Sequence, residues 1–157
     1  MALYRLLFGG EVDCAHPDTG VYWELKTSRH WTNRRQEENF HRFKTRKWWL
    51  QSFLVGIEEI LCGFRDDQGI VRRLETLRLK DLARNPMATW SAAVCMNFLE
   101  AVLSHIKAVI GEEMEEKVFL MEWDPLHSKN GGKIELSQHG AMSLDSVLFP
   151  EFRKAWI

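Results

Sequence analysis

Alternating and helical spacings of apolar residues divide the first third of the chain into clear elements. Residues 5–14 and 21–27 are rich in β-branched and aromatic residues, which predicts two strands on either side of the turn-forming run 16–20. The short link favours an antiparallel hairpin. Residues 36–54 contain neither proline nor glycine, which predicts a helix that ends near Gly56.

The remaining pattern predicts a second helix and further strands. Apolar residues recur at spacings of three and four across 91–110, and a second apolar face there predicts a largely buried helix that ends at Gly111. Strands are predicted at 59–64, 70–79, 117–123 and 133–137, the first two as a hairpin around Asp66–Gly69. The chain therefore reads as one α+β domain over residues 1–157, with a mixed or antiparallel sheet flanked by helices.

Composition narrows the class of protein. Of the 157 residues, 45% are hydrophobic, which is enough for a core. No apolar run approaches about 20 residues, so no membrane span is expected, and the apolar start of the chain is too short for a signal peptide. The few, widely spaced cysteines Cys14, Cys62 and Cys95 indicate reduced thiols in an intracellular protein. Net charge is −1, but the first 84 residues carry the basic excess, so a polyanionic partner would meet that half.

Two charged motifs carry the candidate chemistry. Glu11 and Asp13 in the first predicted strand, and Glu24 and Lys26 in the second, stand at i and i+2 among apolar neighbours. Side chains two apart share one face of a strand, so the pattern predicts three carboxylates and a lysine on one face of a hairpin. Carboxylates, with the carbonyl of Leu25, are ligands that Mg²⁺ or Mn²⁺ prefers, and two such ions can activate water beside a phosphate.

The first helix adds a third element. One of its faces carries Lys44, Lys47, Trp48 and Gln51, and an adjoining core-facing stripe is predicted to hold Phe40, Phe43, Leu50 and Leu54. Gln51 could donate to a phosphate oxygen or to a metal-bound water, and Lys26 could orient the attacking water.

Other interpretations of these residues remain. Charged strand faces and lysine-rich helix faces are often simply solvated surface. Cys14, His16 and Cys62 lack the spacing of a structural zinc site, and a Cys–His nucleophile would need a spatial pairing that the sequence does not show. No P-loop or dinucleotide-binding glycine motif is present.

Longer runs around the motifs resemble a known family. An E-x-D and an E-x-K motif followed by a K-x3-Q helix is similar to the core of PD-(D/E)xK nucleases, and the chain more closely resembles the eukaryotic decapping exoribonuclease family. The similar runs are LLFGGEVDC at 6–14, YWELKTS at 22–28, KWWLQSFLVG at 47–56, GFRDDQG at 63–69 and VCMNF at 94–98.

The resemblance implies metal-dependent hydrolysis at RNA 5′ ends: removal of NAD caps and incomplete caps, then 5′–3′ degradation. It implies Mg²⁺ or Mn²⁺, two ions, RNA 5′ ends and a 5′–3′ exoribonuclease as partners, no membrane, and a nuclear location. The implied site residues are metal ligands Glu11, Asp13, Glu24 and Leu25, catalytic residues Glu24, Lys26 and Gln51, and substrate-binding residues Lys26, Arg29, Lys47 and Gln51.

The resemblance covers only the C-terminal part of a typical family member. The expectation is that an arginine motif and a further acidic motif, which precede this part in relatives, are missing. The alternatives are therefore a catalytically deficient module that binds RNA or an exoribonuclease, or a DNA nuclease of the wider superfamily. We also expect exposed apolar surface, weak metal binding, and a Lys26→Ala variant that folds normally because Lys26 faces the site and not the core.

Overall fold

The computed structural model describes residues 6–111, 117–126, 132–140 and 142–156, and of Trp156 it describes the backbone only. The chain divides into two compact units, the first running to Leu99 and the second beginning at Glu100. Each unit is described by itself, and the prediction of a single domain stays a prediction.

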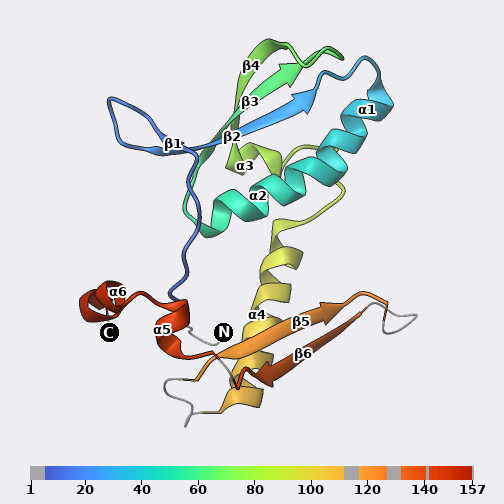
Figure 1. Cartoon of the computed structure of the whole chain (residues 1–157). Helices are drawn as coiled ribbons and strands as arrows, with labels where there is room; N and C mark the ends of the chain where they lie inside the picture. The colour runs from blue at the N-terminus through green and yellow to red at the C-terminus, as the bar shows by residue number, and fades with distance from the viewer. Residues whose placement is uncertain (1–5, 112–116, 127–131, 141, 157) are drawn as a thin grey trace. The chain divides into compact units, whose positions relative to one another are not determined.

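A four-stranded mixed sheet forms the first unit (Figure 1). Its order is β1 (Cys14–Ala15), β2 (Tyr22–Arg29), β3 (Glu59–Arg65) and β4 (Val71–Arg78). β2 and β3 are parallel, whereas β1–β2 and β3–β4 are antiparallel hairpins. The α+β class with a mixed sheet is confirmed, and so are both hairpins. The prediction of a strand at 5–14 is wrong for most of its length, because only Cys14 of this range pairs with β2.

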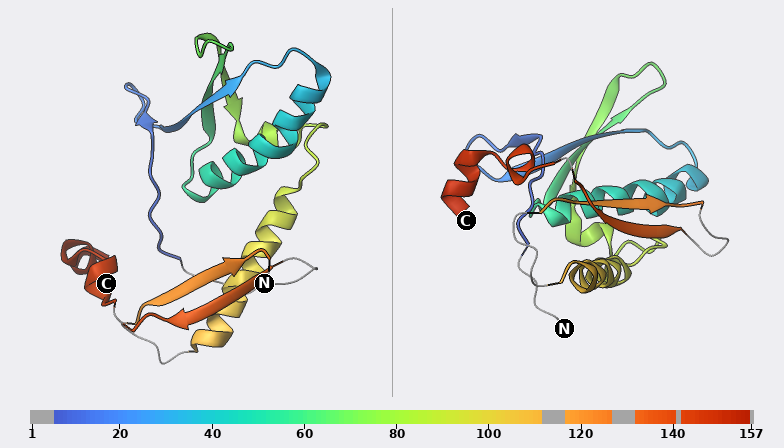
Figure 2. Two further views of the ribbon diagram at one scale, coloured as in Figure 1. Left: turned by 45° about the vertical axis from the view of Figure 1, so that its right-hand side comes forward. Right: turned by 60° about the horizontal axis from the view of Figure 1, so that its bottom comes forward.

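One long helical segment connects the two parallel strands and covers one face of the sheet (Figures 1 and 2). It comprises α1 (Arg34–Asn39), the π-helical turn η1 (Phe40–Lys44) and α2 (Thr45–Leu54). Asn33 caps its start by accepting a hydrogen bond from the amide of Gln36. Gly56, with a φ of +75°, lies just beyond its end, as predicted.

The π-helical turn corrects the predicted core stripe of this helix. Phe40 is buried and Leu50 is partly buried against the core, as predicted, but Phe43 and Leu54 are exposed. Thr45, Trp48, Trp49 and Ser52 are also buried. In η1 the amide of Thr45 donates to the carbonyl of Phe40, an i+5 bond that inserts one residue into the turn. Every later residue is thereby rotated by about 100° relative to a regular helix. Sequence spacing alone could not anticipate this shift.

The core of this unit lies between the sheet and that helical segment. Ile60, Cys62 and Phe64 of β3 are fully buried on the covered face. They pack with Phe40, Trp48 and Trp49 and with Leu79 and Leu82 of the short helix α3 (Leu79–Leu82). Trp48, which spacing placed on the face with Lys44 and Gln51, therefore belongs to the core.

The opposite face of the sheet is uncovered in this chain. Leu25, Val71 and Leu74 are each more than two-fifths exposed. Leu25 and Leu74 stand opposite Leu61 and Gly63 of β3, so they belong to the face away from the helix. Exposed apolar surface, which the sequence analysis expects, is therefore present on this face.

Helix α4 (Ala92–Ile110) is formed as predicted, but the prediction that it is largely buried is wrong. None of its residues is buried, and Val94 and Phe98 are more than three-fifths exposed. Its nineteen residues are also long and apolar enough to cross a membrane by length and composition alone, a measure that core helices of water-soluble proteins satisfy as well. The expectation that no segment approaches this measure is therefore not met.

The second unit contains the two strands predicted at 117–123 and 133–137. Strands β5 (Phe119–Asp124) and β6 (Lys133–Gln138) pair antiparallel. Two short helices that the sequence analysis does not predict follow, α5 (Leu144–Val147) and α6 (Pro150–Trp156). An ion pair of 2.7 Å between Arg153 and Asp145 joins them. Asn130 and Gly131, which lie between the two predicted strands, are outside the described residues.

Candidate functional site

The centre of the candidate site is an ion pair on β2. The Glu24 carboxylate is 1% exposed and its Oε1 atom accepts from the Lys26 ammonium, whose side chain is 20% exposed. Within the described residues, the second oxygen of Glu24, Oε2, is buried and has no hydrogen-bond partner. A buried carboxylate oxygen that no donor satisfies costs free energy, which is common at functional sites and rare elsewhere.

Register explains why this pair lies where it does. In the parallel β2–β3 ladder, Glu24 stands opposite Ile60, Lys26 opposite Cys62, and Ser28 opposite Phe64. These three β3 residues form the helix-covered face, so the charged row of β2 shares the face that carries the core. The shared face of Glu24 and Lys26 is as predicted.

The same register corrects the expectation about Lys26. It was expected to face the site and not the core, but its side chain neutralises a carboxylate buried beside that core. Loss of the Lys26 ammonium would leave Glu24 without its cation, so its role is structural as well.

Asp13 contributes to the site from the segment before β1. Its Oδ2 atom accepts a hydrogen bond of 2.7 Å from the amide of Leu25, the residue that follows Glu24. The β1–β2 ladder ends at the Cys14–Trp23 pair, so the Asp13 carboxylate takes an amide that a longer β1 would have paired through its backbone. Asp13 therefore lies beside the Glu24 position although the predicted strand is not formed.

Glu11 is exposed and lies on the irregular segment that leads into β1. The preceding residue, Gly10, runs against the end of α2: a Cβ added there would lie 2.2 Å from Cγ1 of Val55. Only a glycine allows so close a passage. This contact holds the segment near the helix that carries Gln51.

The predicted convergence of three carboxylates is not found. Among the residues that the structure describes, no group of three His, Cys, Asp or Glu side chains is close enough to hold an ion. The donors fit a hard divalent cation in type, since among the described residues Glu24 has a buried oxygen without a partner and the Asp13 carboxylate is bonded to the amide of the next residue, Leu25.

The helix and the end of β2 hold the other predicted residues. Gln51 and Lys47 are exposed on α2, whereas Trp48, placed with them by spacing, is buried. Arg29 is exposed at the end of β2 and forms an ion pair with Asp67, with 2.6 Å between Nε and Oδ1. Arg29 is therefore not part of the Glu24–Lys26 cluster.

Sequence reasoning missed one contact that extends the charged row. Lys44 Nζ donates a hydrogen bond of 3.0 Å to Oγ of Ser28, which is buried two residues after Lys26. The i and i+2 rule that relates Glu24 to Lys26 also reaches Ser28, so the signal was present in the alternation of β2.

Burial shifts two titrations near this row. Burial raises the pKa of the Cys62 thiol to about 11, with a smaller contribution from the charge of Glu75. Burial also lowers the pKa of His41, against the opposing charges of Glu37 and Glu75. Both effects show that the helix-covered face is a low-dielectric environment, in which the Glu24–Lys26 attraction is strengthened.

Comparison with known proteins places these features in a family. The family model of the RAI1-like PD-(D/E)XK nucleases matches residues 2–153. The decapping and exoribonuclease protein of Xenopus laevis is 42% identical over 131 residues, which cover 78% of this chain and 33% of that protein.

Two solved structures share the fold. Scheffersomyces stipitis Rai1 in complex with 3′-NADP⁺ and calcium ion has a TM-score of 0.67 at 28% identity, covering 83% of this chain and 34% of the other. Candida albicans Rai1 in complex with pU5 and Mn²⁺ has a TM-score of 0.65 at 28% identity, and the match covers 92% of this chain and 42% of the other.

The chain spans about a third of the length of the curated relatives that it matches. The family match nonetheless extends over nearly all of its residues, including both charged motifs and the helix with Gln51. The chain belongs to the RAI1-like PD-(D/E)XK nuclease family.

Proposed function

We propose that this chain carries part of the catalytic centre of a metal-dependent RNA decapping hydrolase, which removes NAD caps and incomplete caps and degrades RNA from its 5′ end. The observation that carries the proposal is the buried Glu24 carboxylate, with one oxygen on Lys26 and the other without a partner among the described residues. The relatives support it by their names and bound ligands: a decapping and exoribonuclease protein, and Rai1 structures with 3′-NADP⁺ or with pU5 and Mn²⁺.

The chain's own residues would divide the work. Glu11, Asp13 and Glu24, with the Leu25 carbonyl, would hold Mg²⁺ or Mn²⁺, two ions in all. Bound divalent ions supply an activated water and neutralise charge on the phosphate. Lys26 is held beside Glu24 by its ion pair, and its ammonium would offset the charge that develops on the phosphoryl group.

The remaining predicted residues would bind RNA. Gln51 and Lys47 are exposed on α2 and free to meet a phosphate oxygen. Arg29 would exchange its exposed partner Asp67 for RNA, a small cost because surface ion pairs contribute little stability. In this proposal the protein acts in the nucleus on RNA 5′ ends, and a fluorescent fusion of the chain tests that location.

A second function has a specific observation in its favour. The described residues gather no three-carboxylate cluster, and one face of the four-stranded sheet is uncovered. A module that binds RNA or an exoribonuclease without turnover needs neither a complete metal site nor a second layer. The same Glu24–Lys26 pair would then serve stability alone.

Turnover and metal binding separate the two functions. We expect the full 157-residue chain to release NAD from NAD-capped RNA in Mn²⁺, and the Glu24→Gln variant to lose this activity while keeping its melting temperature within a few degrees. Calorimetry should show Mn²⁺ binding that Asp13→Asn weakens. Binding of 5′-phosphorylated RNA by a chain that neither binds Mn²⁺ nor turns over would support the module and overturn the hydrolase, and activity on DNA alone would indicate a DNA nuclease.

A further inference from the structure

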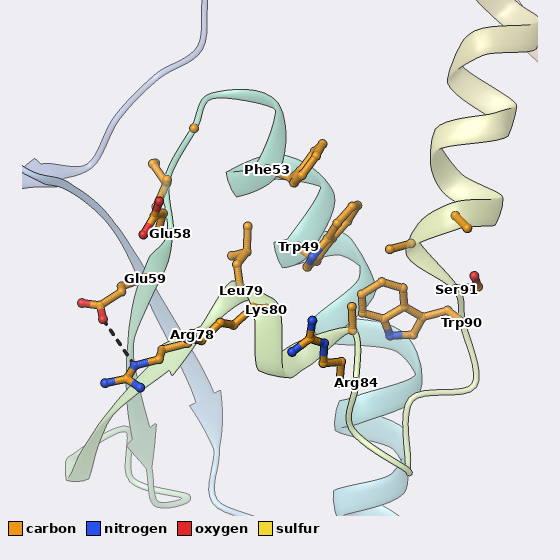
Figure 3. Close-up of a pocket in the computed structure, with 15 residues that line it drawn as sticks. Trp49, Phe53, Glu58, Glu59, Arg78, Leu79, Lys80, Arg84, Trp90 and Ser91 are labelled. Atoms are coloured by element: carbon orange, nitrogen blue, oxygen red, sulfur yellow. Dashed lines mark ion pairs between the residues drawn. The ribbon is translucent and has the colours of Figure 1, made fainter. Parts of the chain in front are cut away.

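The first unit contains a cavity of about 1090 Å³ that the charged motifs do not explain. It lies where α2 ends, beside α3 and the start of α4 (Figure 3). Glu58, Glu59 and Arg78 lie at one end, and Trp90, Arg84 and Ser91 at the other. Its size is that of a small-molecule or nucleotide site.

This cavity is separate from the candidate catalytic face. Trp49 and Phe53 of α2 line it, while Gln51 of the same helix does not. Residues of an α-helix advance by about 100° each, so Gln51 points to the side of α2 opposite to Trp49 and Phe53. Neither Glu24 nor Lys26 is among the lining residues.

Three aromatic rings form one wall. Trp49 and Phe53 are stacked, with their ring centroids 4.5 Å apart and an angle of 14° between planes, and Trp90 lies 5.7 Å from Trp49. Trp49 is buried, but Phe53 is 46% exposed. The stack therefore ends in an exposed ring on which a further planar group can lie.

Two cations beside that wall are available to an anion. Arg78 is paired with Glu59 at 3.7 Å. Lys80 and Arg84 are exposed, and within the described part of the chain neither side chain makes an ion pair or a hydrogen bond. Arg84 and Trp90 both line the cavity (Figure 3), so the aromatic wall and a positive charge without an ion pair among the described residues border the same space.

We infer that this cavity binds one nucleotide of a single-stranded RNA, with the base stacked on Phe53 and a phosphate held by Lys80 and Arg84. The site goes beyond the proposed hydrolysis, because it needs no metal and lies on the other side of α2. An acidic peptide would also be attracted by the two cations. The open end of a flat aromatic stack favours a base, since bases present planar π-faces of any sequence.

The test is RNA binding without metal. Fluorescence anisotropy with a labelled, 5′-phosphorylated oligoadenylate is measured on the full chain in EDTA, which removes binding through metal ions, and the cavity variants then report on this site. We expect Phe53→Leu to weaken binding about fivefold or more, since each base–aromatic stack contributes strongly. Arg84→Gln should weaken RNA binding about threefold. It should also reduce the slope of log binding constant against log salt concentration by about one.

Matched variants keep the result specific. Lys107→Gln removes an exposed positive charge from α4, outside the cavity, and should bind as the unmodified chain does. An oligonucleotide carrying 5-iodouridine should crosslink, under ultraviolet light, to peptides that contain Phe53 or Trp90.

Three results would overturn the inference. One is equal binding by Phe53→Leu, Arg84→Gln and the unmodified chain, and another is crosslinking only to peptides outside the cavity. The third is displacement of the RNA by oligoglutamate of equal charge, which would show that charge alone is recognised. Unchanged melting temperatures of the variants ensure that loss of binding is not loss of folding.

Discussion

The two charged motifs share one sequence pattern but occupy two different environments. Glu24 and Lys26 lie in the middle of β2, paired with each other on the face that the helix covers. Glu11 and Asp13 lie on the segment before β1, and both are exposed. The first motif is held by a parallel ladder and a core, whereas the second is held by one hydrogen bond to Leu25 and the passage of Gly10 past Val55.

The contrast shows how a site can be half organised. The β2 half is fixed by the same contacts that stabilise the fold, so its geometry does not depend on a ligand. The other half costs little to move, because few contacts hold it. A metal ion or a longer chain could therefore draw the Glu11 segment toward Glu24 without disturbing the sheet, and this difference can be tested one residue at a time.

The largest expected effect is on the fixed half. Lys26→Met removes the ammonium and leaves the Glu24 carboxylate buried without its cation. We expect the free energy of unfolding, measured in urea, to fall by about 2–3 kcal/mol, toward the lower end of the range for buried pairs because Lys26 is partly exposed.

A double variant controls this experiment. Glu24→Gln together with Lys26→Met removes both charges, so it should be more stable than Lys26→Met alone. A single variant as stable as the unmodified chain would show that the pair is not a structural element and would restore the original expectation that Lys26 can be lost without harm to folding.

The second expected effect is a loss of stability at alkaline pH caused by Cys62, which lies on β3 opposite Lys26. Burial raises the pKa of Cys62 to about 11 from an ordinary value of 9.0. The folded state therefore favours the protonated thiol, its contribution is complete below pH 9, and it is lost as pH rises from 9 to 11. We expect stability to fall by about 1 kcal/mol by pH 10.

A Cys62→Ala variant separates this titration from others. Its stability should decline less between pH 9 and 10, even if it is lower throughout because a buried side chain is shortened. Thiol alkylation at pH 8 offers a second readout, since Cys14 and Cys95 are partly exposed and should react before the buried Cys62. Equal rates for all three would contradict the buried assignment.

The spacing of apolar and polar residues predicted most of the helices and strands, and it predicted that Glu24 and Lys26 share one face of β2. The β2 strand and the β3–β4 hairpin have strong alternation and turn residues, and the relation of Glu24 to Lys26 follows from strand geometry alone. The parallel register of β2 and β3 is a long-range contact, so the position of Lys26 on the face that carries the core could not be predicted from spacing.

Three mistakes have distinct physical causes. The strand at 5–14 fails because a β-like sequence forms a strand only where a partner strand extends alongside it. The predicted burial of Leu54 in the core stripe of the helix is wrong because η1 rotates the residues after Lys44. The burial of α4 fails because an apolar helix needs a surface to pack on, and no residue of α4 is buried in this chain.

A smaller effect is expected at the hydrogen bond that joins Asp13, on the segment before β1, to Leu25 of β2. Asp13→Ala removes the acceptor for the Leu25 amide and should lower the free energy of unfolding by about 1 kcal/mol. Hydrogen exchange at the Leu25 amide should accelerate. Asp13→Asn retains an acceptor oxygen and should protect that amide better than alanine does, and equal exchange in all three proteins would show that the bond is not populated in solution.

The smallest expected effect on stability belongs to Glu11. The Glu11→Gln variant should unfold within about 0.5 kcal/mol of the unmodified chain, because the side chain is exposed. If Glu11 moves in to bind a metal, the same variant should weaken Mn²⁺ binding, measured by calorimetry, by at least the roughly tenfold that loss of an outer-shell partner costs. Glu151→Gln, an equally exposed change on α6, is the matched control. A stable variant with weaker Mn²⁺ binding would show that the mobile half joins the site on binding metal, whereas unchanged Mn²⁺ affinity would leave the fixed half of the site without this ligand.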